Sequence, residues 1–463
     1  MSYRQIFRAE IRPTLRLALP LVLAEIGWMT MGIVDTIMVG HLPNSAVAIG
    51  SVSLGTTLFY MVGIFGSSIM LGLDTLVAQA YGAGRVKECH RDLFNALYFA
   101  LVLAPIVMLL VFAGLPLLER SGVDPSVLKE TIPFIHALNW STLPLILYFV
   151  FRRYLQAMNI VKPVVFALVS ANLVNLFGNW VFVYGHLGFP AFGVSGSGWS
   201  TCISRVYMVL VLAVAVVYYD RRRSSGLWQA SRVLELARIR QLLRLGLPAA
   251  GQLLLEISAF ACATLLVGRL GALALAGHQI ALNIASITYM VPLGISSAAA
   301  VRVGHAFGAR DIHAASRAGW TALCLGGGFM ACMAIVIVSI PRLLAEIYSP
   351  QLEVIRTGAS LLLVVAVFQL FDGLQVVATG ALRGAGNTHT PMLTNLLGYW
   401  LIGIPLGSFL AFKLHWGPAG VWTGLCVALI IIGCVLVTVW SRLMKRLAQE
   451  LSQQVQSQAG SND

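Results

Sequence analysis

The chain has 463 residues, of which 58% are hydrophobic and 11% are charged. Because soluble proteins carry about 25% charged residues, this composition excludes an ordinary soluble enzyme and indicates side chains that mostly face lipid or each other. The net charge of +13 would suit a nucleic-acid-binding protein, but its distribution along the chain argues against nucleic acid as a partner.

Twelve apolar segments of spanning length predict an all-α polytopic membrane protein. A bilayer crossing takes about 20 apolar residues, and the first segment follows a polar, arginine-containing stretch without a cleavable signal pattern. The predicted transmembrane helices are 14–39, 46–72, 93–116, 131–152, 163–186, 192–219, 244–267, 278–301, 318–341, 354–379, 391–413 and 418–441. We expect them to form two pseudo-symmetric six-helix bundles.

The placement of lysine and arginine predicts the orientation of these helices. Of the 31 such residues, 24 lie on one predicted side of the membrane, six lie on the other, and Arg205 lies inside a span. Since basic loops stay in the cytoplasm, both termini are expected there, and the protein is expected to be a multi-pass protein of the cell membrane. This placement accounts for the positive charge without nucleic acid.

Segments from the two halves of the chain resemble one another. Leu-Pro pairs end at Pro20 and Pro248, 228 residues apart, and NLFGNW at 175–180 resembles NLLGYW at 395–400. These matches predict one six-helix module present twice. Because each module has an even number of helices, both copies enter the membrane in the same sense.

A basic linker between the sixth and seventh predicted helices marks the domain boundary. We predict an N-terminal six-helix lobe (1–219), a cytoplasmic linker (220–243), a C-terminal six-helix lobe (244–441) and a polar cytoplasmic tail (442–463).

Three acids inside predicted spans are the first candidates for a functional site. Asp35, Glu256 and Asp372 each place a carboxyl group where a charge costs about 2.5–3.5 kcal/mol on insertion scales. Each is either a buried acid bonded to neighbouring hydroxyls and amides, or a proton- or cation-coupling group. Three such acids together favour the coupling role.

Polar side chains on the same helix faces form the second set of candidates. Spacings of three and four residues place amides next to the acids along a helix, and the repeat links the amides of the fifth helix to the eleventh. These candidates for a polar substrate cleft are Gln252, Gln369, Gln375, Asn175, Asn179, Asn395 and Tyr399. Simple hydrogen bonding between helices is the alternative role for each.

Three further charges complete the set of candidates. Arg205 is a candidate to neutralise one of the acids, and the sequence does not say which one. Glu25 and Asp74 lie nearer to the predicted cytoplasmic side, where they either reach interfacial water or contact substrate. No histidine or cysteine cluster has metal spacing, and no GxxxxGK[ST] loop is present, so we expect no cofactor and no structural metal, with an ion gradient as the energy source.

The chain resembles the multidrug and toxic compound extrusion (MATE) transporters. The resemblance covers nearly the whole chain and rests on VDTIMVGHL (34–42), AQAYGAG (78–84), DGLQVVATGALRGAGNT (372–388) and GYWLIGIPLG (398–407). It implies a secondary antiporter, not an enzyme, that exports cationic and amphipathic drugs by alternating access in exchange for H⁺ or Na⁺. We expect it to be a monomer in the lipid bilayer.

The resemblance also implies roles for single residues. Glu256 and Asp372 match the cation-site acids of the NorM-like branch, where Na⁺ is an alternative to the proton, and Asp35 matches the acid of the N-terminal lobe. Relatives that bind sodium can have a tyrosine where Phe368 stands, which favours protons here. A flippase for polyprenyl-linked sugars, from a related superfamily, is the alternative function; it would need cationic groups, whereas the charges inside these spans are mostly acidic.

Overall fold

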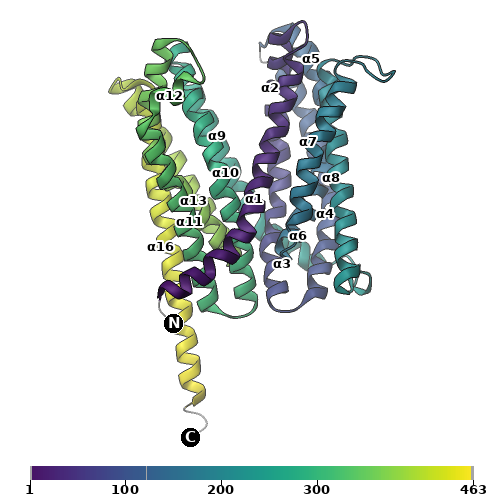
Figure 1. Ribbon diagram of the computed structural model, residues 1–463, viewed down its shortest axis with the longest axis vertical. Coiled ribbons are helices and arrows are strands. Elements are labelled where there is room, and N and C mark those ends of the chain that lie inside the picture. Colours follow the sequence, from purple (N-terminus) through teal and green to yellow (C-terminus); the bar gives the residue numbers. More distant parts are fainter. Residues whose placement is uncertain (1–2, 121, 460–463) are drawn as a thin grey trace. The chain divides into compact units, whose positions relative to one another are not determined.

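The computed structural model describes residues 3–120 and 122–459, and these residues form helices and connecting turns without a β-strand. The chain divides into two compact units, Leu23–Ala250 (unit 2) and Met1–Val22 with Gly251–Asp463 (unit 1). Figure 1 labels α1 to α13 and α16 along the chain. Each unit is a bundle of long apolar helices.

Unit 2 contains the second part of α1 and the first part of α9. Between them lie α2 (Ser45–Ser68), η1 (Ile69–Leu71), α3 (Gly72–Gly82), α4 (Val86–Glu119), α5 (Pro125–Asn139), α6 (Thr142–Ala157), α7 (Lys162–Phe182), α8 (Val194–Arg223) and η2 (Leu227–Gln229).

Unit 1 contains the start of α1 (Tyr3–Val39) and the larger part of α9 (Leu236–Gly268). Its other elements are α10 (Ala272–Gly308), α11 (Ile312–Ser339), α12 (Pro341–Glu346), α13 (Leu352–Gly384), α14 (His389–Asn395), η3 (Leu396–Gly403), α15 (Ile404–Ser408), η4 (Phe409–Lys413) and α16 (Gly417–Ala459).

The helices agree with the predicted number of membrane spans. Eleven helices of the described chain are long and apolar enough to cross a bilayer, and the bent pair α5–α6 makes twelve. The two members of this pair meet at 45°. The break follows from its sequence, because Ser141 Oγ donates to the Leu138 carbonyl at 2.5 Å and Pro144 has no N–H to continue the ladder.

The unit boundaries differ from the predicted domain boundaries. Both fall inside a continuous helix, two residues after Pro20 in α1 and two residues after Pro248 in α9. The predicted linker is therefore part of unit 2, and residues 3–22 belong to unit 1. The reason is close helix packing, which residue-by-residue hydropathy does not reveal.

Small residues let these crossing segments approach their neighbours. A Cβ at Gly246 of α9 would lie 2.1 Å from the Ile69 carbonyl oxygen, and one at Gly294 of α10 would lie 2.7 Å from the Val22 nitrogen. A glycine also allows α10 and α13 to pack closely, because a Cβ at Gly380 would lie 2.2 Å from the Ser296 carbonyl oxygen. Backbones in lipid commonly approach one another through such small residues.

The predicted tail is mostly helical. Helix α16 continues through Ala459 and extends past the other helices of unit 1 at its C-terminal end (Figure 1). Residues 460–463 lie outside the described residues.

Candidate functional site

Two carboxyl groups lie together inside unit 1. Glu256 on α9 and Asp372 on α13 are both buried, with 7% and 4% of their surface exposed. They are close enough for their negative charges to repel one another. A shared proton or a bound cation would relieve that repulsion, because like charges in a low-dielectric interior strongly disfavour double ionisation.

Neutral amides surround the Glu256 carboxylate. Gln252 Nε2 donates to Glu256 Oε2 at 3.4 Å, and Asn395 Nδ2 of α14 donates to the same oxygen at 3.3 Å. Tyr289 of α10 also faces this carboxylate. Since these partners are uncharged, they orient the carboxylate without neutralising it.

Several buried polar atoms beside the two acids are left without a hydrogen bond. The amide nitrogen and oxygen of Gln369 and of Gln375 on α13 are buried and unpaired, as is the Tyr399 hydroxyl of η3. Gln375 faces Glu256, although its amide does not reach hydrogen-bonding geometry. A buried unpaired polar group costs about 1–3 kcal/mol. Such a set of open donors and acceptors fits a site that takes a polar or cationic ligand.

Asp35 occupies a second polar cluster inside unit 2. Its Oδ1 accepts hydrogen bonds from Asn175 Nδ2 at 3.0 Å and from Asn179 Nδ2 at 2.7 Å, and its Oδ2 accepts one from Thr201 Oγ1 at 2.8 Å. Asn175 and Asn179 lie one turn apart on α7, so both amides reach the same carboxylate. Asn172, on the same face, instead donates to the Gly27 carbonyl at 2.9 Å.

The predicted candidates thus separate into two clusters. Asp35, Asn175 and Asn179 belong to unit 2, whereas Glu256, Asp372 and the remaining amide and tyrosine candidates belong to unit 1. Sequence reasoning missed Tyr289 and Thr201. Thr201 lies one helical turn before Arg205 and therefore on the same face of α8. Its position beside this charge could have drawn attention to it.

Glu25 and Asp74 form buried ion pairs in unit 2. Glu25 pairs with Arg152, and Asp74 pairs with Arg153 at 3.3 Å. The prediction that these acids reach interfacial water is therefore wrong. Arg152 at the end of a predicted span and Arg153 just after it both lie inside α6 and are buried. Their charges are matched across helices, because a buried charge without a partner is strongly destabilising.

Arg205 does not neutralise an acid within the described parts of the chain. Its Nη1 donates to Ser141 Oγ at 2.6 Å, and its guanidinium carbon lies 5.1 Å from the ring centre of Phe59 and 5.9 Å from that of Trp28. Because Ser141 follows the C-terminal end of α5, the cation lies near the negative end of that helix. Arg205 therefore stabilises the α5–α6 break.

An aromatic cluster packs next to the acids of unit 1. Phe368, one turn before Asp372, has its ring centre 5.4 Å from that of Trp422 and 6.0 Å from that of Phe260. Phe260 in turn lies 6.0 Å from Tyr399. Sequence analysis singled out Phe368 alone, because the other rings are distant in sequence.

Comparison with known proteins gives the family. The sequence model of the MatE family matches residues 20–181 and 248–409. The second match begins 228 residues after the first, which confirms the internal repeat. Together the two matches cover more than half of the chain.

Curated relatives and solved structures agree with this match. The "Probable multidrug resistance protein NorM" of Mesorhizobium japonicum is 38% identical, with 94% of this chain and 95% of that protein covered. The protein of the same name from Brucella suis is 34% identical, with 94% and 93% covered.

Among solved structures, the eukaryotic MATE transporter AtDTX14 superposes with a TM-score of 0.84 at 22% identity, covering 96% of this chain and 99% of that one. An outward-facing multidrug resistance MATE family transporter of the MOP superfamily gives a TM-score of 0.83 at 17% identity, with 96% and 98% covered. These likenesses show the fold, and the sequence matches show that the chain belongs to the MatE family of transporters, on its NorM-like branch.

Proposed function

We propose that this protein is a secondary antiporter that exports cationic and amphipathic drugs and other toxic compounds in exchange for H⁺ or Na⁺. The observation that carries the proposal is the pair of buried carboxyl groups in unit 1, Glu256 and Asp372, with unpaired amides beside them. Intramembrane acids of this kind commonly form ion and proton pathways. The names of the NorM relatives support multidrug export as the task.

The chemistry of the exchange follows from competition for one negatively charged cluster. When both carboxyl groups are ionised, their mutual repulsion favours binding of an organic cation. A proton or a sodium ion at Glu256 or Asp372 lowers the negative charge and releases that cation. Alternating access would present the cluster to one side of the membrane at a time. The exchange requires no covalent chemistry and no cofactor.

The polar groups around the acids suit the recognition of varied substrates. Gln369, Gln375 and Tyr399 offer donors and acceptors on two elements, and Phe260 and Phe368 offer aromatic faces nearby. Organic cations bind favourably over aromatic rings. We expect the exporter to act as a monomer in the bacterial inner membrane, with both termini in the cytoplasm, as the arginine distribution indicates.

The test removes one charge while keeping the shape. In cells expressing Asp372→Asn, export of ethidium should fall about tenfold or more, as expected when a charge interaction of about 1.4 kcal/mol is lost. Efflux of the dye is followed by fluorescence, with the amount of folded protein in membranes measured alongside.

A matched control lies on the same helix. Glu353 in the first turn of α13 is exposed, so Glu353→Gln removes the same charge outside the cluster and should leave export unchanged. Normal ethidium export by Asp372→Asn would contradict the assigned role of that carboxyl group.

A further inference from the structure

The segment that joins α8 to α9, residues 224–235, is held firmly against α4 in unit 2. Ser225 contributes its carbonyl to a hydrogen bond with His90 Nε2 at 3.1 Å. Tyr98 Oη donates to the Arg232 carbonyl at 2.8 Å, and the Glu235 amide donates to Asn95 Oδ1 at 2.7 Å. These contacts along the segment fix the path of its backbone against α4. We call residues 224–235 the linker segment.

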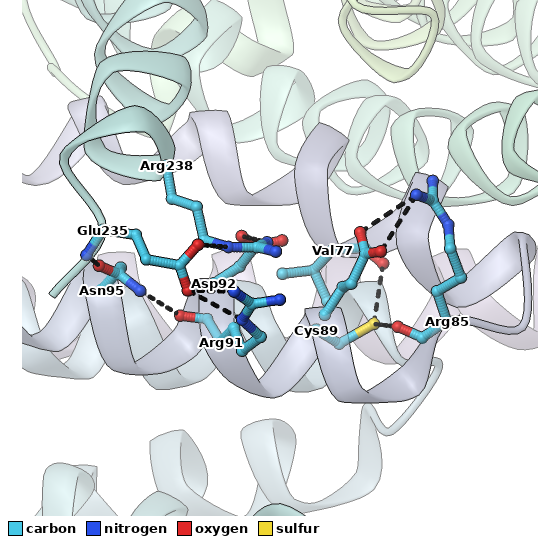
Figure 2. A network of polar contacts seen from close by, with 9 residues as sticks. Val77, Arg85, Cys89, Arg91, Asp92, Asn95, Glu235 and Arg238 are labelled. Carbon is cyan, nitrogen blue, oxygen red and sulfur yellow. Dashed lines mark hydrogen bonds and ion pairs between the residues drawn. The ribbon is translucent and has the colours of Figure 1, made fainter. Parts of the chain in front are cut away.

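A network of charges completes the attachment (Figure 2). Arg91 Nη2 lies 2.6 Å from Glu235 Oε1, and Arg238 lies 2.6 Å from Asp92 Oδ1 and 3.0 Å from Glu235 Oε2. Burial alone would raise the pKa of Glu235, but the hydrogen bonds from Arg91 and Arg238 outweigh it and hold this pKa below its ordinary value. Glu235 therefore stays ionised at neutral pH.

The position of α4 places the linker segment at a membrane surface. The 34 residues of this helix extend about 50 Å at 1.5 Å per residue, well beyond a hydrocarbon core of about 30 Å. The linker segment contacts its first turns, between His90 and Tyr98. It also joins the ends of two helices that are themselves long and apolar enough to span.

The outward side of this region combines apolar and cationic side chains. The exposed fractions are 56% for Trp228, 66% for Val233, 53% for Leu234 and 73% for Leu236. The exposed arginines of residues 221–244 are Arg221, Arg222, Arg223, Arg232, Arg240 and Arg244. We call these exposed side chains the linker patch.

No acid opposes the linker patch from within its own described segment. Asp220 is buried and accepts hydrogen bonds from Ser225 Oγ at 2.6 Å and from the Leu227 amide at 2.8 Å. Glu235 is engaged by two arginines. Arg232, in contrast, has its guanidinium carbon over two aromatic rings, 5.0 Å from the Trp228 centre and 5.7 Å from that of Phe94, and these contacts restrain its position.

We propose that the linker patch is a binding surface for the headgroups of anionic phospholipids in the leaflet that borders it. Arginines bind lipid phosphates as bidentate donors, while tryptophan and leucine insert at the boundary between headgroups and acyl chains. The exposed apolar residues favour lipid over a soluble polyanion as the ligand. If nucleic acid or an acidic peptide bound here, these apolar side chains would remain in water. Bound lipid would hold the joint between the repeats at a fixed depth.

The expected strength follows from the charge. Each arginine near an anionic surface contributes about a fivefold gain in affinity. Because the arginines are exposed, the gain should weaken as the salt concentration rises.

The experiment uses the full chain in nanodiscs of phosphatidylcholine, with and without one quarter phosphatidylglycerol. Hydrogen exchange of residues 224–235 is measured by mass spectrometry, and retained phosphatidylglycerol is counted by native mass spectrometry. The anionic lipid should slow exchange in this segment. In Arg232→Gln/Arg240→Gln, bound phosphatidylglycerol should fall about fivefold for each arginine removed, and the slowing should disappear.

The matched control is Arg442→Gln/Lys445→Gln, which removes two exposed positive charges from α16. It should keep the slowed exchange at residues 224–235, and unaltered exchange in α13 shows that each variant is folded. Equal exchange of the unaltered protein in both nanodiscs would overturn the proposal. So would the same slowing by inorganic phosphate in nanodiscs of phosphatidylcholine alone. None of these readouts depends on drug export.

Discussion

The ring of His278 is held between two side chains that fix which nitrogen carries its proton. Trp422 Nε1, which can only donate, lies 3.1 Å from His278 Nδ1. Nδ1 is therefore the acceptor, and Nε2 carries the proton toward Thr264 Oγ1 at 2.9 Å. Histidine and tryptophan are both fully buried. This neutral ring holds Trp422 against Phe368, one turn from Asp372.

Replacing the imidazole of His278 with a ring that has no nitrogen should therefore destabilise unit 1. His278→Phe leaves the Trp422 N–H buried without an acceptor, at a cost of about 1–3 kcal/mol, and the melting temperature in detergent should fall. In the double variant His278→Phe/Trp422→Phe the loss should be smaller than the sum of the two single losses. Simple addition of the two would show that the bond contributes nothing.

At the scale of single residues, the sequence predicted the burial of Asp35, Glu256 and Asp372, but not the burial of Glu25 and Asp74 or their partners. Asp35 and the α7 amides could be matched, because amides four residues apart share a helix face. The pairing of Glu25 on α1 with Arg152 on α6 was not predicted. Arg152 ends the predicted span 131–152, and the sequence does not distinguish a paired arginine there from an exposed one.

At the scale of helices, the acid and its amide partner stand at different positions along the corresponding helices of the two repeats. Glu256 lies eight residues after Pro248, and its partner Asn395 lies four residues after Pro391. In the other repeat Asp35 lies fifteen residues after Pro20, and Asn175 follows Pro163 by twelve. Acid and amide have therefore shifted together by about two helical turns. The similar motifs at 175–180 and 395–400 therefore share a function, because each supplies an amide that contacts the acid of its own repeat. They do not occupy equivalent positions in the two repeats.

Helix α9 offers a test of the close packing that sets the unit boundary. Gly246→Ala would place a Cβ 2.1 Å from the Ile69 carbonyl oxygen, and overpacking of this kind costs about 1–3 kcal/mol. That exceeds the gain of about 1 kcal/mol in helix propensity from glycine to alanine. The melting temperature of the purified protein should therefore fall.

Gly268 of the same helix is the control. Nothing lies within 4 Å of a Cβ added there, so Gly268→Ala should leave the melting temperature unchanged or raise it. Equal effects of the two substitutions would mean that the packing at Gly246 is looser than the structure shows.

At the scale of the whole chain, duplication has produced two chemically different clusters. Asp35 has hydrogen bonds to both carboxylate oxygens from neutral donors, whereas the acids of unit 1 face each other beside unpaired amides. The fold class and the repeat were predictable, because both depend on hydropathy and on similarity between segments. The unit boundaries were not, since glycine–carbonyl contacts between distant helices decide them.

The acids and aromatic residues of unit 1 lead to a prediction about which ion drives transport. Sodium needs several oxygen ligands, since hard cations prefer carboxylate and carbonyl oxygens. Phe368 offers none at its position and instead packs on Trp422. In proteoliposomes, an imposed pH gradient alone should therefore drive transport of a cationic dye, and an imposed sodium gradient alone should not. Glu256→Gln should abolish the transport driven by pH. Dye movement driven by sodium alone would show that the remaining carboxylate and amide oxygens complete a sodium site without a tyrosine.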